Sequence, residues 1–289
     1  MKKFKIFTDS ACDLPISYIN EKNIPFAKLS CTYDNKTYFD NFGQDISFKD
    51  FFDNLRNGIM PLTSQPSVEE FYNKFLEIVK NDEDILYICV SSGLSGTENS
   101  ANIAKKMILD DYPNSRIEII NALSASLGQG LVVIKAIELQ EAGNSLDEVI
   151  SHILELRKHL TTFMTVDDLH HLKRGGRISS ASAMIGIVLH IKPILALDSE
   201  GKIKSIGKAR GRKASILKLA QLVCENIKNP ENQILGIAHG DSLEDALSLK
   251  KEILKKINVK DVVVNCTGMA VGTHGGPNNL AVFFLGNKI

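Results

Sequence analysis

Four short segments of the chain place hydroxyl, amide or imidazole side chains where a strand or loop is expected to end. They are Thr8-Asp9-Ser10, Thr63-Ser64-Gln65, Ser91 to Thr97, and Gly272 to Pro277. Short polar side chains and nearby backbone N–H groups are suited to hold an anion or a polar head group by hydrogen bonds. These segments are the candidate binding residues of the chain.

The segment Ser91 to Thr97 follows an apolar run over 84–90 and precedes a helical pattern over 96–110. A strand, a Ser/Gly loop and a helix start bring free N–H groups and hydroxyls to one point, which suits an anion. The loop contains no Lys or Arg, so we expect a carboxylate held mainly by neutral donors. A simple capping role for Ser95 and Thr97 explains the pattern equally well.

His274 lies among glycines, where the backbone can approach a ligand closely. An isolated histidine is nevertheless more often structural than functional. Thr63-Ser64-Gln65 also fits an ordinary loop before a helix, and Asp13 fits a cap of the helix after Pro15. Both interpretations stay open for each segment.

A serine hydrolase is the alternative function. Gly93-Leu94-Ser95-Gly96-Thr97 is close to the G-x-S-x-G nucleophile motif, although Thr97 stands in place of the final glycine. Ser95 and His274 would act as nucleophile and base, but the sequence identifies no third, orienting acid. Phosphate-binding glycine motifs are absent from the sequence, and the adjacent His170 and His171 lack metal-ligand spacing, so no metal site is expected.

The first half of the chain predicts an α/β domain over 1–159. Expected strands alternate with expected helices, which favours a Rossmann-like, mostly parallel sheet. A small β-hairpin over 26–33 and 36–40 is inserted, and 61–67 is expected to be a loop. The expected strands cover 4–7, 84–90 and 116–120, and the expected helices cover 15–22, 47–57, 67–80, 96–110, 125–142 and 145–159.

The second half predicts an α+β domain over 160–289 with a mixed or antiparallel sheet. Two apolar elements, a helix over 180–190 and a strand over 280–285, have no polar face and either fill the core or line an apolar cavity. A ligand is expected in the cleft between the two domains. The other expected elements are strands at 161–166, 192–198, 202–208, 233–238 and 261–266, and helices ending at 172 and covering 212–228 and 242–257.

Composition excludes some classes of protein. The 289 residues carry no formal net charge, which argues against a nucleic-acid-binding protein. The five cysteines are scattered and form no CxxC pair, as in a reducing cytoplasm, where we expect the protein to act. The chain begins on a strand pattern without a signal-peptide apolar region, and no apolar run approaches the ~20 residues of a membrane span.

Basic residues cluster in two expected turns of the second half. They form either solvated loops or one patch that docks an acidic partner or a phosphorylated ligand. The residues are Lys173, Arg174, Arg177, Lys208, Arg210, Arg212 and Lys213.

The ordered set of segments resembles the DegV family of bacterial fatty-acid-binding proteins over essentially the whole chain. No single motif is specific, but their order and spacing are. The matching residues are Phe7-Thr8-Asp9-Ser10, Asp13-Leu14, Thr63-Ser64-Gln65-Pro66, Ser91 to Thr97, Gly128-Gln129-Gly130, Leu172 to Ser179, Ile191-Lys192-Pro193-Ile194, Ala209-Arg210, Ala238-His239-Gly240-Asp241 and Val271-Gly272-Thr273-His274.

The resemblance implies one long-chain fatty acid, such as palmitate, stearate or oleate, between the two domains. Its carboxylate would be held by Thr63 and Ser95 with His274 nearby. The neighbouring positions would be Ser64, Gly96 and Thr273. Ile185, in the apolar segment 181–189, would line the alkyl chain. No metal and no cofactor other than this ligand is implied.

The resemblance also implies a partner. In the fatty-acid kinase system, members of the family present the carboxylate to a separate ATP-dependent kinase and carry the acyl phosphate to phospholipid synthesis. Arg177 and Arg210 match family positions implicated in docking the kinase. Such a carrier performs no catalysis alone, and a transient contact with a membrane surface is compatible with its role.

The sequence departs from the family pattern after His274. Family members commonly read Gly-Thr-His-Thr-Gly-Pro-Gly-Ala, whereas here Gly275 replaces the second Thr, and Asn278 and Asn279 replace Gly-Ala. One hydroxyl is lost and two amides are gained. The departure is expected to alter the head-group pocket more than the class of ligand.

Overall fold

A computed structural model describes residues 2–167, 169–178 and 191–287. Its first half contains a parallel sheet of four strands in the order β2-β1-β6-β7. The mostly parallel sheet that the sequence predicts is confirmed, although residues 26–27 belong to this sheet and not to the expected hairpin. Every residue of β6 is buried, which explains its continuous apolar run. The strands are β1 (Phe4–Asp9), β2 (Phe26–Ala27), β6 (Asp84–Cys89) and β7 (Ile117–Asn121).

Helices cover both faces of this sheet. On one face, Phe7 and Tyr87 pack against α3 (Val68–Val79) and α4 (Thr97–Asp111). On the other face, Ile6, Leu86 and Ile88 pack against α5 and α6. Successive strand residues point to opposite faces, so one apolar run supplies both cores. The helices of the second face are α1 (Ile16–Glu21), α5 (Leu127–Glu141) and α6 (Leu146–Leu156).

The inserted hairpin is part of a sheet of three strands, in the order β4-β3-β5. β3 (Ser30–Tyr33) and β4 (Lys36–Phe39) form the expected hairpin, with α2 (Phe48–Arg56) after it. The expected loop at 61–67 is wrong in part, because β5 (Leu62–Ser64) pairs antiparallel with β3. A strand of three residues has too short a pattern to be read from sequence, and here it forms through pairing with β3.

The second half contains a mixed sheet of six strands in the order β10-β9-β8-β13-β11-β12. Neighbouring strands are antiparallel except β11 and β12, which are parallel. The first strand of this sheet, β8, begins at Leu160, the residue at which the sequence predicts the second domain to begin. The division into domains 1–159 and 160–289 stays a prediction. The strands are β8 (Leu160–Thr165), β9 (Ile191–Leu197), β10 (Ile203–Arg210), β11 (Ile234–His239), β12 (Asp261–Cys266) and β13 (Leu280–Leu285).

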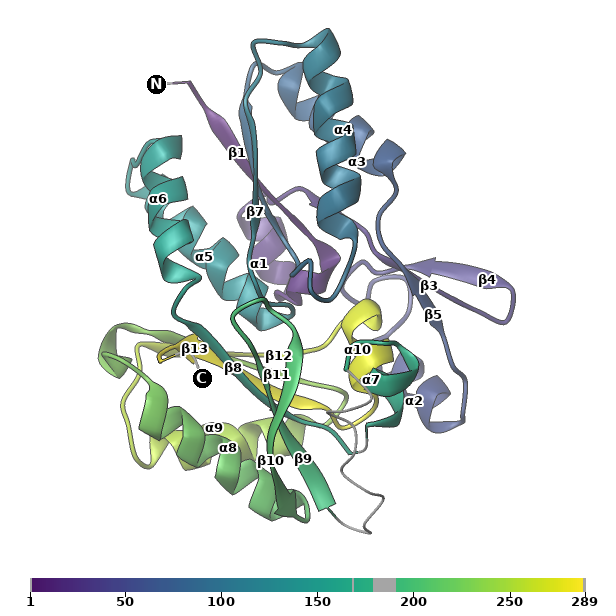
Figure 1. Ribbon diagram of the computed structural model, residues 1–289, viewed down its shortest axis with the longest axis vertical. Coiled ribbons are helices and arrows are strands. Elements are labelled where there is room, and N and C mark those ends of the chain that lie inside the picture. Colours follow the sequence, from purple (N-terminus) through teal and green to yellow (C-terminus); the bar gives the residue numbers. More distant parts are fainter. Residues whose placement is uncertain (1, 168, 179–190, 288–289) are drawn as a thin grey trace.

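The two halves share a core. α8 (Arg212–Asn226) and α9 (Leu243–Leu254) cover the face of the six-stranded sheet that is turned away from the first half (Figure 1). On the opposite face, Phe283 of β13 belongs to the same cluster as Leu127 of α5. The helices of the first half therefore also bury the second sheet.

The segment after β12 is a helix, α10 (Met269–Gly275), in a stretch where the sequence predicts neither a helix nor a strand. Its first N–H groups are bound by buried carboxylates: Gly268 N donates to Asp13 Oδ1 at 2.8 Å, and Ala270 N donates to Asp40 Oδ2 at 2.9 Å. Glycine weakens helices on its own. These contacts with the first half stabilise α10. The residues that make them are distant in sequence, so the local sequence does not predict the helix.

A second difference is α7 (His170–Arg174), which continues two residues into the expected turn. The predicted apolar helix over 180–190 lies outside the described residues, as does Ile185. Among the described residues, the structure has no helix of the length and apolarity that a membrane crossing requires.

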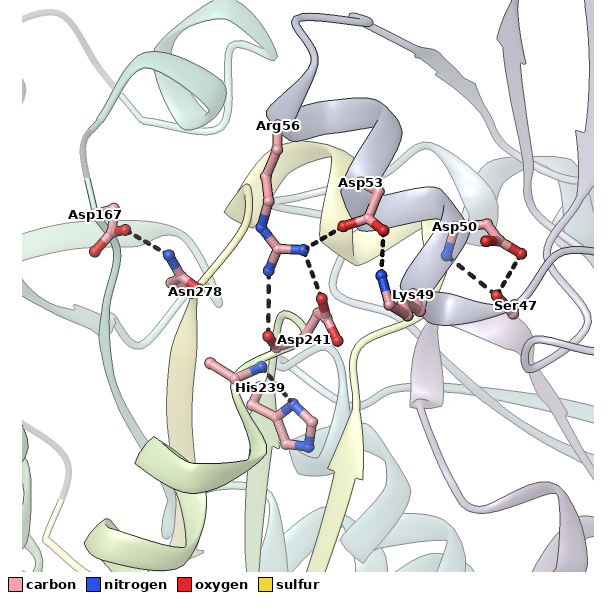
Figure 2. A network of polar contacts seen from close by, with 10 residues as sticks. Ser47, Lys49, Asp50, Asp53, Arg56, Asp167, His239, Asp241 and Asn278 are labelled. Atoms are coloured by element: carbon pink, nitrogen blue, oxygen red, sulfur yellow. Dashed lines mark hydrogen bonds and ion pairs between the residues drawn. The ribbon is translucent and has the colours of Figure 1, made fainter.

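Polar contacts join α2 to the loop after β11 (Figure 2). Arg56 Nη1 contacts Asp53 at 2.9 Å and Asp241 at 2.6 Å, and Arg56 Nη2 donates to the Asp241 carbonyl oxygen at 3.2 Å. Separately, Asn278 donates to Asp167 at 2.8 Å. Exposed ion pairs add little stability one by one, but several donors on one guanidinium orient α2 beside the second half.

We expect Gly272→Ala to destabilise the protein, because a Cβ atom there would lie 2.8 Å from Phe52 Cζ and 3.0 Å from Phe51 Cε1. Both rings are fully buried and have little room to move. Urea unfolding should show a loss of about 1–3 kcal/mol.

Gly207→Ala is the matched control, because the nearest atom to its Cβ would be 4.0 Å away. Its unfolding free energy should stay within about 0.5 kcal/mol of the wild type. Equal stability of both variants would contradict the packing of α10 on α2.

Candidate functional site

A cavity of about 390 Å³ lies between the six-stranded sheet and the loops of the first half. Its size falls in the range of small-molecule sites. Most of its wall is apolar and comes from both halves of the chain. The apolar lining includes Ala11, Leu29, Val90, Leu94 and Ala125 from the first half and Met164, Val166, Leu197, Ile203, Ala281 and Phe283 from the second.

Four of the residues predicted to bind the ligand line this cavity. Thr63 and Ser64 come from β5, Ser95 from the loop before α4, and His274 from α10. They are brought together by the pairing of β5 with β3 and by the packing of α10 beside both. The cavity thus has hydroxyl and imidazole groups on a mostly apolar wall.

His274 Nε2 lies 2.8 Å from Thr63 Oγ1, and either atom can donate, depending on the tautomer. Burial lowers the pKa of His274 to about 3, and the nearby positive charges of Arg177 and Arg174 act in the same direction. The ring is therefore neutral at physiological pH and serves as a hydrogen-bonding group. In the part of the chain that the structure describes, Nδ1 has no hydrogen-bond partner.

Ser95 Oγ lies 2.8 Å from Thr97 Oγ1. Neither hydroxyl caps α4, whose N-cap residue Gly96 makes no side-chain cap bond. The capping interpretation is therefore wrong for Ser95. The hydrolase alternative gains no support either, because His274 Nε2 is paired with Thr63, and an imidazole with a pKa of about 3 is a weak base at neutral pH.

Gln65 also lines the cavity. The sequence includes it in a candidate segment but assigns it no role. Its Nε2 donates to Ser100 Oγ at 2.7 Å, so it joins β5 to α4. Gly96 does not line the cavity; a Cβ atom at this position would lie 2.2 Å from Gln65 Oε1. Gly96 thus acts indirectly, by admitting the side chain of Gln65 between the two hydroxyl-bearing segments.

Thr273 does not line the cavity, contrary to the prediction. Its side chain is buried, and Oγ1 donates to the Met269 carbonyl oxygen at 2.8 Å and lies 3.5 Å from Cys31 Sγ. Adjacent helical residues point about 100° apart, so a helix that turns His274 to the cavity turns Thr273 away from it. The sequence predicts no helix here, so it gives no sign of this separation.

Arg177 lines the cavity, whereas the sequence predicts it at a docking surface. Its Nε donates to the Leu94 carbonyl oxygen at 2.9 Å. Arg177 thus adds one cation to a set of donors that the sequence predicts to be mainly neutral, because residue 177 is far in sequence from the Ser/Gly loop and near it in space. Arg210, at the end of β10, is exposed and lies outside the cavity lining.

The two asparagines that depart from the family pattern stabilise the turn after α10. Asn279 Nδ2 donates to the Gly276 carbonyl oxygen at 2.8 Å and to Thr267 Oγ1 at 3.3 Å, and Asn278 donates to Asp167. Asn279 and Gly275 both line the cavity. The donor atoms of the added amides are thus used within the protein.

We expect His274 to lower stability in mild acid. Its folded-state pKa of about 3 lies below its ordinary value of 6.5, so its contribution to stability is complete above pH 6.5 and is lost as pH falls toward 3. His274→Gln should flatten the dependence of the unfolding free energy on pH between about 6.5 and 4, measured by urea denaturation.

The control is His152→Gln, which removes an exposed imidazole that is hydrogen-bonded to the Glu148 carbonyl oxygen of its own helix. Nitrogen-15 NMR of the ligand-free protein should also show a neutral His274 ring from pH 8 to 5. A protonated ring at pH 6 would contradict the buried, cation-flanked geometry.

Known proteins resemble the chain over its whole length. The model of a family described as uncharacterised DegV proteins matches residues 3–287. A DegV domain-containing protein of Clostridium perfringens is 45% identical over 287 residues, covering 99% of each chain.

Solved structures agree with this match. A structure described as showing fatty acid binding of a DegV family protein from Thermus thermophilus is 30% identical, with a TM-score of 0.87 and coverage of 99% of this chain and 100% of the other. A protein from Eubacterium ventriosum described as binding stearic acid is 26% identical, with a TM-score of 0.83 and coverage of 97% and 98%. The chain belongs to the DegV family.

Proposed function

We propose that this protein binds one long-chain fatty acid, such as palmitate, stearate or oleate, with its alkyl chain in the apolar part of the cavity. The carboxylate would lie at Thr63, Ser64, Ser95 and His274. The observation that carries the proposal is one continuous cavity that joins these polar groups to apolar walls from both halves. The fatty-acid-binding descriptions of the similar Thermus and Eubacterium proteins support it.

The energetics fit an amphipathic ligand. Burial of an alkyl chain contributes about 0.8 kcal/mol per CH₂, so ~14 methylenes supply ample gross affinity. Hydroxyl donors and the neutral His274 orient the head group at a smaller gain for each bond. Affinity then comes mainly from the alkyl chain, and position comes from the polar end.

We further propose that the protein is a cytoplasmic carrier without catalysis of its own. It presents the carboxylate to a separate fatty-acid kinase and carries the acyl phosphate toward phospholipid synthesis. The neutral, Thr63-bound His274 and the Thr97-bound Ser95 favour a carrier over a hydrolase. The exposed Arg210 is the candidate kinase contact, a transient membrane contact is compatible with delivery, and Ile185 is the candidate wall of the alkyl chain.

The double variant Thr63→Ala/Ser95→Ala should bind palmitate about 10- to 100-fold more weakly, because two head-group hydroxyls are lost. Partition of radiolabelled palmitate between protein and phosphatidylcholine vesicles measures the change. Thr37→Ala/Ser248→Ala removes two exposed hydroxyls and should bind as the wild type does. Unchanged binding by the first variant would reject the head-group assignment, and a wild type without bound or captured fatty acid would reject the function.

Arg210→Glu should leave palmitate binding intact and lower the rate of acyl phosphate formation when a bacterial fatty-acid kinase and ATP are added. Reversal of an exposed charge slows association with the kinase and makes that association less dependent on salt concentration. The control is Lys208→Glu, an exposed neighbour on β10. Equal kinase rates for wild type and Arg210→Glu would remove Arg210 from the docking surface.

A further inference from the structure

Two hydroxyl groups form a pair beside the cavity. Ser95 Oγ lies 2.8 Å from Thr97 Oγ1, and the distance alone allows either atom to be the donor. Ser95 is partly exposed and lines the cavity, whereas Thr97 is fully buried and does not line it. The direction of this hydrogen bond decides what Ser95 can offer to a ligand.

The burial of Thr97 fixes that direction. A hydroxyl has one proton to donate, and a buried proton without an acceptor costs free energy. Among the described residues, no acceptor other than Ser95 Oγ lies within hydrogen-bond distance of Thr97 Oγ1. Thr97 therefore donates its proton to Ser95.

Ser95 is thereby left with one free donor. Its backbone N–H is used within the loop, because it donates to the Ser91 carbonyl oxygen at 3.0 Å. Its hydroxyl oxygen accepts the Thr97 proton, so its own hydroxyl proton can point into the cavity. Hydrogen bonds in a chain polarise one another, and the bond accepted from Thr97 makes the Ser95 proton a better donor.

The direction matters because an ionised carboxylate accepts hydrogen bonds and donates none. If Ser95 donated to Thr97 instead, only lone pairs of Ser95 would face the carboxylate, and they would repel it. We propose that Thr97 is a positioning residue, which holds the Ser95 hydroxyl as a donor to the carboxylate without itself lining the cavity. This inference rests on the proposed binding of a fatty acid.

The test measures the partition of radiolabelled palmitate between protein and phosphatidylcholine vesicles at pH 8. Thr97→Val nearly keeps the shape of the side chain but removes the hydroxyl, and it should bind palmitate about 3- to 10-fold more weakly. Thr97→Ser keeps the hydroxyl and should restore wild-type binding. The control, Thr37→Val, removes one hydroxyl of an exposed pair, in which Thr37 Oγ1 lies 2.9 Å from Thr32 Oγ1, and should bind as the wild type does.

A double-mutant cycle separates positioning from a structural role. In the Ser95→Ala background, Thr97→Val should cause no further loss of binding, because the hydroxyl that Thr97 orients is gone. Equal losses in both backgrounds would overturn the assignment, as would a Thr97→Ser variant that binds as weakly as Thr97→Val. Thr97→Ala carries the same expectations if Thr97→Val does not fold.

The outcomes also separate this inference from the proposed function. Undiminished binding by Thr97→Val, with palmitate captured by the wild type, would overturn only the role of Thr97. Wild-type binding by Ser95→Ala would overturn the head-group assignment and this inference together. A wild type that captures no palmitate would reject the proposed function itself, and this inference with it.

Discussion

The packing of α10 against the first half is the constraint on which the site depends. Asp13 and Asp40 are fully buried and accept the first N–H groups of this helix. Burial raises the pKa of Asp40 to about 6, while the hydrogen bonds from α10 favour its charged form. The carboxylates and the helix start thus stabilise each other, and the far end of the helix brings His274 to Thr63.

Because α10 packs in this way, the polar end of the cavity is assembled from four segments that are distant in sequence. β5, the loop before α4, the turn after α7 and α10 each supply one or two groups. Gln65 joins β5 to α4 through Ser100. Arg177 joins the loop before α4 to the turn after α7 through Leu94 and Gly175. The cavity walls are therefore tied together by the same residues that form its polar end.

The charges of the site favour binding over acid–base chemistry. The imidazole is neutral and bonded to a threonine, and the serine is bonded to another threonine. The charged group that remains, Arg177, is a permanent cation that cannot exchange protons near neutral pH. Such a site can hold and orient an anion.

Much of the fold was readable from sequence because its signals are local. The alternation of strands and helices predicted the parallel sheet, and the apolar run over 84–90 predicted a strand buried on both faces. Thr63, Ser64, Ser95 and His274 were found as polar groups beside expected strands and loops. Ser/Gly content and spacing are properties of a short stretch of chain, so they can be read from the sequence without the tertiary structure.

Tertiary structure alone decided the remainder. β5 exists because β3 pairs with it, and α10 exists because distant carboxylates bind its N–H groups. These contacts turn Thr273 away from the cavity and bring Arg177 into it. Sequence by itself determined which groups were available; the direction of each side chain, and the charge that the cavity presents, followed from long-range contacts that no local pattern encodes.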